Sequence, residues 1–130
     1  MTDKVTLKDI EKVVLENKVP FQEFIALETV STQGRQIRET AEYVVKMFED
    51  LGGEAQILDD LNDSYPFVYG YFEAGSGGNK EQTILFYNHY DVQPEEPVDL
   101  WTTPPFTLSR TEDDRLVGRG VSDDKGELMA

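Results

Sequence analysis

The sequence predicts an α/β fold in which helices pack on a mostly parallel or mixed sheet. Apolar residues recur at helical spacing through the first third of the chain, and after Gly53 they form short runs separated by turn-forming residues. The run Ile84-Leu85-Phe86-Tyr87 is apolar at consecutive positions, which is typical of a central strand covered on both faces. At 130 residues the chain suits one compact domain.

The individual elements follow from these patterns. Helical spacing of apolar residues predicts helices around residues 10–14, 21–25 and 37–51, and Gly52-Gly53 ends the third of them. Strands are predicted at residues 55–58, 67–72 and 83–87, and good helix formers at 127–130 predict the beginning of a further helix. The glycine-rich residues 75–79 are predicted to be a plain hairpin loop, because no Gly-Lys-Ser/Thr follows as a phosphate loop requires.

Composition excludes several classes of protein. A chain with 38% hydrophobic residues is too apolar to be disordered, and no run approaches the ~18 apolar residues of a membrane span. The absence of cysteine and the alternating charged and apolar residues of the opening segment predict a cytoplasmic protein. A net charge of −14 repels nucleic acid and anionic lipid, keeps the protein soluble and attracts metal cations.

A pair of polar residues follows the predicted central strand. His89, the only histidine, and Asp91 come where functional groups gather in open α/β sheets. Alternate residues of an extended segment point to the same side, so the imidazole and the carboxylate can converge. His89 suits a nitrogen ligand of a divalent metal, and Asp91 suits a ligand or the acceptor that orients the histidine. By itself this pair is weak evidence for a metal site, because a lone histidine at a strand end is more often a surface or hydrogen-bonded residue.

The segment GRGVSDDKG supplies further carboxylates. Its glycines, Gly118, Gly120 and Gly126, permit tight backbone geometry around Asp123 and Asp124. Nitrogen and oxygen donors of this kind suit zinc, cobalt or manganese.

Together, HYDVQP with a downstream Trp-x-x-x-Pro-Phe, and GRGxxDDKG, carry a family resemblance. Over almost its whole length the sequence resembles the amino-terminal part of the co-catalytic zinc metallopeptidases, which include aminoacylases, glutamate carboxypeptidases, succinyl-diaminopimelate desuccinylases and carnosinase-like dipeptidases. The Asp-Val-Gln-Pro version of the first motif is nearest the dipeptidase branch. The resemblance implies an α/β catalytic domain of which residues 1–130 are a part, without the family's lid or dimerisation domain.

The resemblance also implies roles for single residues. His89 matches a ligand of one metal, and Asp123 matches the carboxylate that bridges two divalent ions, zinc first, with manganese or cobalt as alternatives. Asp91 matches the active-site aspartate that supports the metal–histidine unit. Asp124 matches the residue joined to the bridging aspartate, often by a cis peptide bond.

The implied reaction is hydrolysis of a small peptide or related amide by a metal-activated water. The family's general-base glutamate and second histidine ligand have no match in these 130 residues, so we expect the chain alone to be inactive. The alternatives are a non-catalytic scaffold that retains the first half of the fold, and a module that binds a single metal. An apolar sheet edge predicts self-association or a homodimer.

Flanking residues have simpler expected roles. Trp101, Pro104, Pro105 and Phe106 are expected to pack a loop against the sheet, with contact to substrate as the alternative. Arg119 and Lys125 are expected to pair with the surplus carboxylates, with contact to substrate as the alternative, and Lys125 is also expected to hold the turn that carries Asp123 and Asp124.

Overall fold

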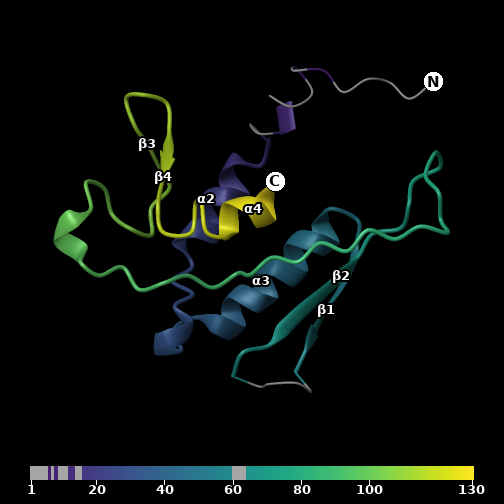
Figure 1. Ribbon diagram of the computed structural model, residues 1–130, viewed down its shortest axis with the longest axis horizontal. Coiled ribbons are helices and arrows are strands. Elements are labelled where there is room, and N and C mark those ends of the chain that lie inside the picture. The colour runs from purple at the N-terminus through teal and green to yellow at the C-terminus, as the bar shows by residue number, and fades with distance from the viewer. Residues whose placement is uncertain (1–5, 7, 9–11, 14–15, 60–63) are drawn as a thin grey trace.

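The computed structural model describes residues 6, 8, 12–13, 16–59 and 64–130 and shows helices beside two small sheets (Figure 1). The elements in chain order are α2 (Lys18–Ala26), a 3-10 turn (Ser31–Gln33), α3 (Ile37–Asp50), β1 (Glu54–Leu58), β2 (Phe67–Tyr71), a second 3-10 turn (Val98–Leu100), β3 (Ser109–Arg110), β4 (Leu116–Val117) and α4 (Lys125–Met129). The α/β class is confirmed. The sheets differ from the prediction, because β1–β2 and β3–β4 are antiparallel pairs.

Helix α3 forms as its apolar stripe predicts. Ile37, Ala41 and Val44 are buried on one face. The helix ends where Gly52 adopts a left-handed conformation with φ 85°, which a glycine adopts without steric cost. Near this end Phe48 packs edge-on against Phe72, with 5.7 Å between the ring centroids. Helix α3 therefore covers the β1–β2 pair.

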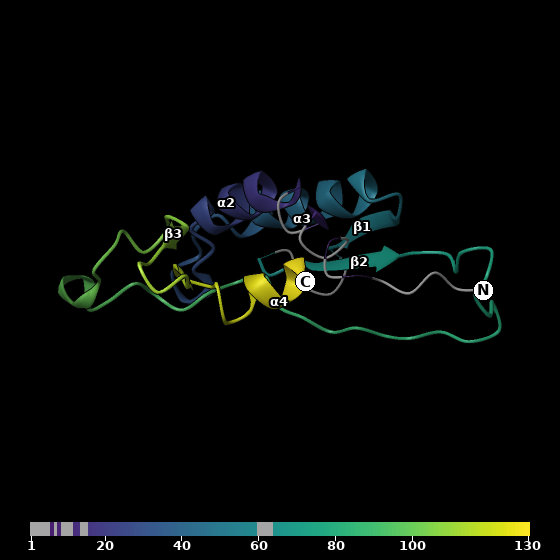
Figure 2. The ribbon, with the colours of Figure 1, turned by 90° about the horizontal axis from the view of Figure 1, so that it is seen from above.

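Helix α2 begins just before Pro20, a residue suited to a first helical turn. Phe24 stacks on Tyr43 of α3 with 5.6 Å between ring centroids, and the Tyr43 hydroxyl donates to the Pro20 carbonyl at 2.8 Å. These contacts hold α2 and α3 in one layer, with β1 and β2 in a second (Figure 2). The expected helix around residues 10–14 falls largely outside the described residues.

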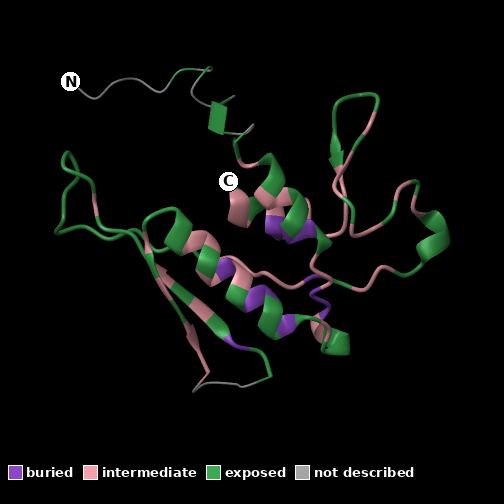
Figure 3. Ribbon diagram, turned by 180° about the vertical axis from the view of Figure 1, so that it is seen from behind, coloured by how far each residue is buried: buried purple, intermediate pink, exposed green. Residues whose placement is uncertain are grey.

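The hydrophobic core lies between α2, α3 and the segment that follows Asp91 (Figure 3). Its buried apolar members are Phe24, Ile25, Val30, Ile37, Ala41, Val44 and Val92. Val92 joins the core because its N–H donates to the Thr29 carbonyl at 2.8 Å and because it forms a parallel bridge with Val30. The core thus lies directly beneath the pair predicted to hold metal.

The predicted central strand at residues 83–87 is wrong. These residues form no strand, and Ile84, Leu85, Phe86 and Tyr87 have relative exposures of 78, 88, 81 and 83%. A strand is stabilised by ladder hydrogen bonds, and no strand among the described residues pairs with this segment. The loop at 75–79 does turn, with the Gly78 N–H donating to the Gly75 carbonyl at 2.8 Å, but it closes no hairpin. Within the described residues, no helix is long and apolar enough to cross a membrane.

Candidate metal centre

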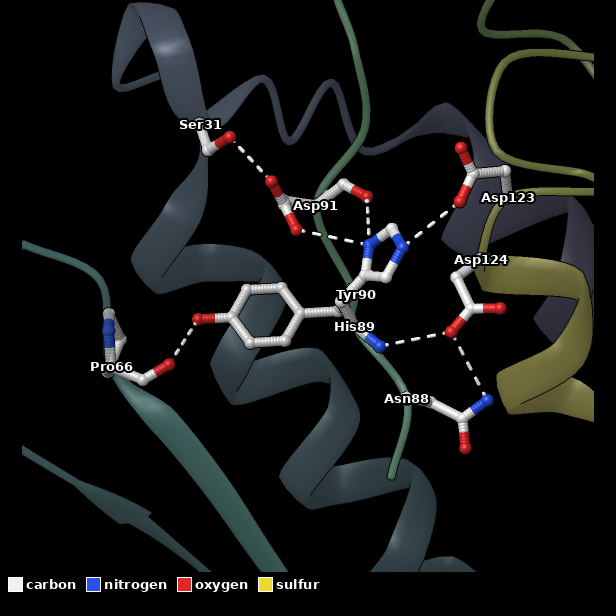
Figure 4. Close-up of polar contacts among 8 residues, drawn as sticks. All are labelled: Ser31, Pro66, Asn88, His89, Tyr90, Asp91, Asp123 and Asp124. Atoms are coloured by element: carbon white, nitrogen blue, oxygen red, sulfur yellow. Dashed lines mark hydrogen bonds and ion pairs between the residues drawn. The ribbon is translucent and has the colours of Figure 1, made fainter. Parts of the chain in front are cut away.

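The extended segment at 88–92 and the aspartate turn, residues 118–126, meet beside the end of α2 (Figure 4). The Nε2 atom of His89 lies 3.0 Å from Asp123 Oδ1. The Nδ1 atom lies 3.0 Å from the Asp91 carbonyl oxygen and 3.2 Å from Asp91 Oδ1. The structure therefore brings together all three residues predicted from the sequence, and both ring nitrogens face oxygen atoms.

The surroundings of His89 favour a positive charge. Burial lowers the pKa of the imidazole, but the hydrogen bonds to the Asp91 backbone and the Asp123 side chain, with the charges of Asp91 and Asp124, outweigh it, so the pKa is raised. Only an imidazolium can donate from both nitrogens at once.

Asp91 is oriented by a residue that sequence reasoning missed. Ser31, which opens the 3-10 turn after α2, donates its hydroxyl to Asp91 Oδ2 at 2.5 Å. The other carboxylate oxygen faces His89, so Asp91 is held from both sides. The neighbouring Tyr90 donates its hydroxyl to the Pro66 carbonyl at 2.5 Å and fixes the segment against the start of β2. The serine stands 60 residues from Asp91, and no spacing rule connects them.

Asp124 has a different role from Asp123. Its Oδ2 atom accepts from the His89 backbone N–H at 3.1 Å and from Asn88 Nδ2 at 3.2 Å. Asp124 therefore ties the aspartate turn to the extended segment, while the side chain of Asp123 stays 78% exposed. The peptide bond between the two aspartates is cis, as the resemblance implied.

Two glycines let the aspartate turn close on itself. Gly120 has φ 89°, and a Cβ there would lie 2.7 Å from Val92 Cγ1. A Cβ at Gly126 would lie 1.9 Å from the Val121 carbonyl oxygen, a distance no real side chain tolerates. The Gly126 N–H donates to the Gly120 carbonyl at 3.1 Å, which closes the turn around the aspartates.

Two basic residues near the site, Arg119 and Lys125, do not have the partners predicted from the sequence. Arg119 lies over the Trp101 ring, 5.0 Å from its centroid, and Lys125 is fully buried. Neither forms an ion pair within the described residues, so the predicted pairing with surplus carboxylates is wrong for both. Burial lowers the pKa of Lys125 to about 7, with the charge of Asp91 acting in the opposite direction.

The loop at 95–106 packs on arginines rather than on the sheet. Trp101 donates its indole N–H to the Glu95 carbonyl at 2.9 Å, and Arg35 lies 5.5 Å from the centroid of the Phe106 ring. Arg35 also forms ion pairs with Glu28 and Glu95.

The donor set fits a divalent cation. Two ligands of one tetrahedral zinc ion, each at about 2.1 Å, lie roughly 3.4 Å apart, and the His89 and Asp123 atoms are separated by 3.0 Å. A small outward movement of the exposed Asp123 carboxylate therefore suffices to admit an ion. Within the described residues, no group of three His, Cys, Asp or Glu side chains is placed to hold a metal.

A half-exposed histidine–aspartate pair facing an exposed carboxylate, on an α/β scaffold, is the arrangement expected of a metal-dependent hydrolase. Comparison with known proteins gives the family: residues 85–130 match Peptidase family M20/M25/M40. The chain belongs to this family, which confirms the resemblance drawn from the two motifs.

Three relatives show how far the similarity extends. Cys-Gly metallodipeptidase dug1 of Schizosaccharomyces pombe is 40% identical over 70% of this chain and 20% of its own. Probable di- and tripeptidase DUG2 of Saccharomyces cerevisiae is 38% identical over 84% of this chain and 14% of its own. The crystal structure of an M20 family metallo-carboxypeptidase, Sso-CP2 from Sulfolobus solfataricus, superposes with a TM-score of 0.74 at 36% identity, over 88% of this chain and 25% of that one. The chain thus spans a fifth or less of the two curated relatives.

Proposed function

We propose that these 130 residues are part of a hydrolase that cleaves dipeptides or related amide bonds. In that hydrolase, His89 and Asp123 bind a divalent metal. The observation that carries this proposal is the 3.0 Å approach of His89 Nε2 to Asp123 Oδ1, with Asp91 behind the ring. Support for the substrate class comes from the names of the relatives, a Cys-Gly metallodipeptidase and a di- and tripeptidase.

Each of the three residues has a distinct task. Asp91 accepts a hydrogen bond from the Nδ1–H of His89, which keeps the proton on Nδ1 and leaves the Nε2 lone pair free for metal. Asp123 offers a carboxylate that is exposed enough to serve a second ion. When bound, the metal would polarise the scissile carbonyl and lower the pKa of a water. Zinc is the first choice, with manganese and cobalt as alternatives.

We also propose that these 130 residues bind metal without turning over a peptide. They contain one histidine and no residue that matches the general-base glutamate which the resemblance implies. Hydrolysis of simple dipeptides with added zinc or manganese tests this proposal, and robust turnover by these residues alone would contradict it.

Calorimetric titration with zinc tests the metal ligands. We expect either change alone, His89→Ala or Asp123→Asn, to abolish measurable zinc binding. Asp113→Asn is the matched control, because Asp113 is an exposed acid that pairs with Arg115 in the β3–β4 turn. A wild-type protein that binds no zinc would favour the alternative of a non-catalytic scaffold.

A second proposal concerns assembly. The apolar run, residues 84–87, presents four large side chains to water, and patches of this kind mark sites of association. We propose that it drives self-association of the protein.

A further inference from the structure

Lys125 occupies an unusual place beneath the aspartate turn. It directly follows Asp124 and is 0% exposed, although lysine is almost never fully buried without a partner. Its Nζ atom donates to the Phe24 carbonyl at 2.7 Å and to the Leu27 carbonyl at 2.5 Å. The same atom lies 4.8 Å from the centroid of the Phe24 ring. The partners of Lys125 are thus the last carbonyls of α2, where the helix dipole favours a donor or a cation.

The residues just after α2 also contact the extended segment that carries His89. The Thr29 carbonyl accepts from the Val92 N–H at 2.8 Å, and Ser31 donates to Asp91 at 2.5 Å. The extended segment that carries His89 is therefore attached to the end of α2 through Val92 and Asp91. Lys125 attaches the aspartate turn to the same end of α2. The distance between His89 and Asp123 therefore depends on both attachments.

We infer that Lys125 is a positioning residue of the metal site: by tying the aspartate turn to the end of α2, it sets the place of the Asp123 carboxylate relative to His89. The inference rests on the proposed metal site. Either protonation state of the amine carries the two N–H donors that the two carbonyls require, so the tie does not depend on charge.

The aspartate turn packs closely against the stem of Lys125. A Cβ added at Gly120 would lie 3.3 Å from both Cγ and Cδ of Lys125, so the turn leaves room for an unbranched chain and little more. Methionine has a similar length without the N–H donors. Lys125→Met therefore removes the tie while largely preserving packing.

Binding of cobalt(II), followed by its visible absorption bands, tests the inference. Lys125→Met should weaken cobalt binding roughly 10- to 100-fold, as is usual when the support of a metal ligand is lost, and should alter the bands of the bound ion. The matched control is Lys80→Met, which removes an exposed lysine paired with Glu73 in the loop after β2 and should change neither. A folded Lys125→Met protein with wild-type affinity and bands would overturn the inference.

Two further measurements keep the inference testable if that variant fails to fold or if the wild type binds no metal. In the wild type labelled with 15N-lysine, saturation with zinc should shift the Lys125 Nζ signal and slow its exchange with solvent. An unchanged signal at saturation would overturn the inference. If the wild type binds no metal, the proposed function fails, and the tie is then tested without metal. The ring 15N shifts of His89, measured at one pH, should differ between the wild type and Lys125→Met. Equal shifts in a folded variant would overturn the inference that Lys125 positions the aspartate turn relative to His89.

Discussion

Two parts of one extended segment, on either side of His89, have opposite surroundings. Val92 is 3% exposed, whereas Leu85 is 88% exposed, although both side chains are aliphatic. Val92 is paired with the backbone at Thr29 and Val30, and residues 84–87 have no such pairing with any other described part of the chain. Both side chains are apolar enough to be buried. Only the one whose backbone pairs with a distant part of the chain is buried.

The strongest test of this comparison places the same charge on both sides of His89. Val92→Asp would bury a carboxylate without a partner and should cost roughly 3–5 kcal/mol in free energy of unfolding. Leu85→Asp stays in water and should change it by less than about 0.5 kcal/mol. Urea denaturation followed by circular dichroism measures both. Equal losses would show that the two side chains share one environment.

A second test compares two glycine loops. Gly126→Ala drives a Cβ into the Val121 carbonyl, so the aspartate turn must shift, and we expect a loss of roughly 1–3 kcal/mol in free energy of unfolding. Gly77→Ala is the matched control, because no atom lies within 4 Å of the added Cβ. Thermal and urea unfolding of both variants check this. A neutral Gly126→Ala would mean that the turn is not closely packed.

Prediction from sequence succeeded where local patterns decide the structure. Helix α3 and the β1–β2 strands follow from periodicity and glycine stops, and His89, Asp91 and Asp123 stand in two short motifs. It failed where a contact joins distant residues: Lys125 meets Phe24 from 101 positions away, and Ser31 meets Asp91 from 60. The run at 84–87 has the composition of a buried strand, but composition does not provide the neighbouring strand.

A third, smaller effect concerns the covered interface of α2 and α3. Burial, followed by the charge of Glu23, raises the pKa of Tyr43 to about 12 from an ordinary value near 10. Because the folded pKa is the higher one, the stabilisation is complete below about pH 10 and is lost as the pH rises through 12.

Tyr43→Phe should therefore flatten the fall in stability between pH 10 and 12. At pH 7 it should cost about 1 kcal/mol, since it removes the hydrogen bond to the Pro20 carbonyl. Tyr87→Phe on the exposed apolar run is the control. Urea denaturation at several pH values measures the slopes. Identical slopes in the wild type and Tyr43→Phe would contradict the prediction.

The smallest effect on stability is expected on the apolar run itself, where association changes instead. Leu85→Asn with Phe86→Asn keeps the net charge at −14, so any change reflects apolar surface rather than repulsion. Because both side chains are already more than 80% exposed, the variant should unfold within about 0.5 kcal/mol of the wild type. Light scattering over a range of concentrations should show self-association of the wild type and less of it in the variant. A wild type that remains monomeric at high concentration would refute self-association through this run, whereas equal association of both proteins would place the contact elsewhere on the surface.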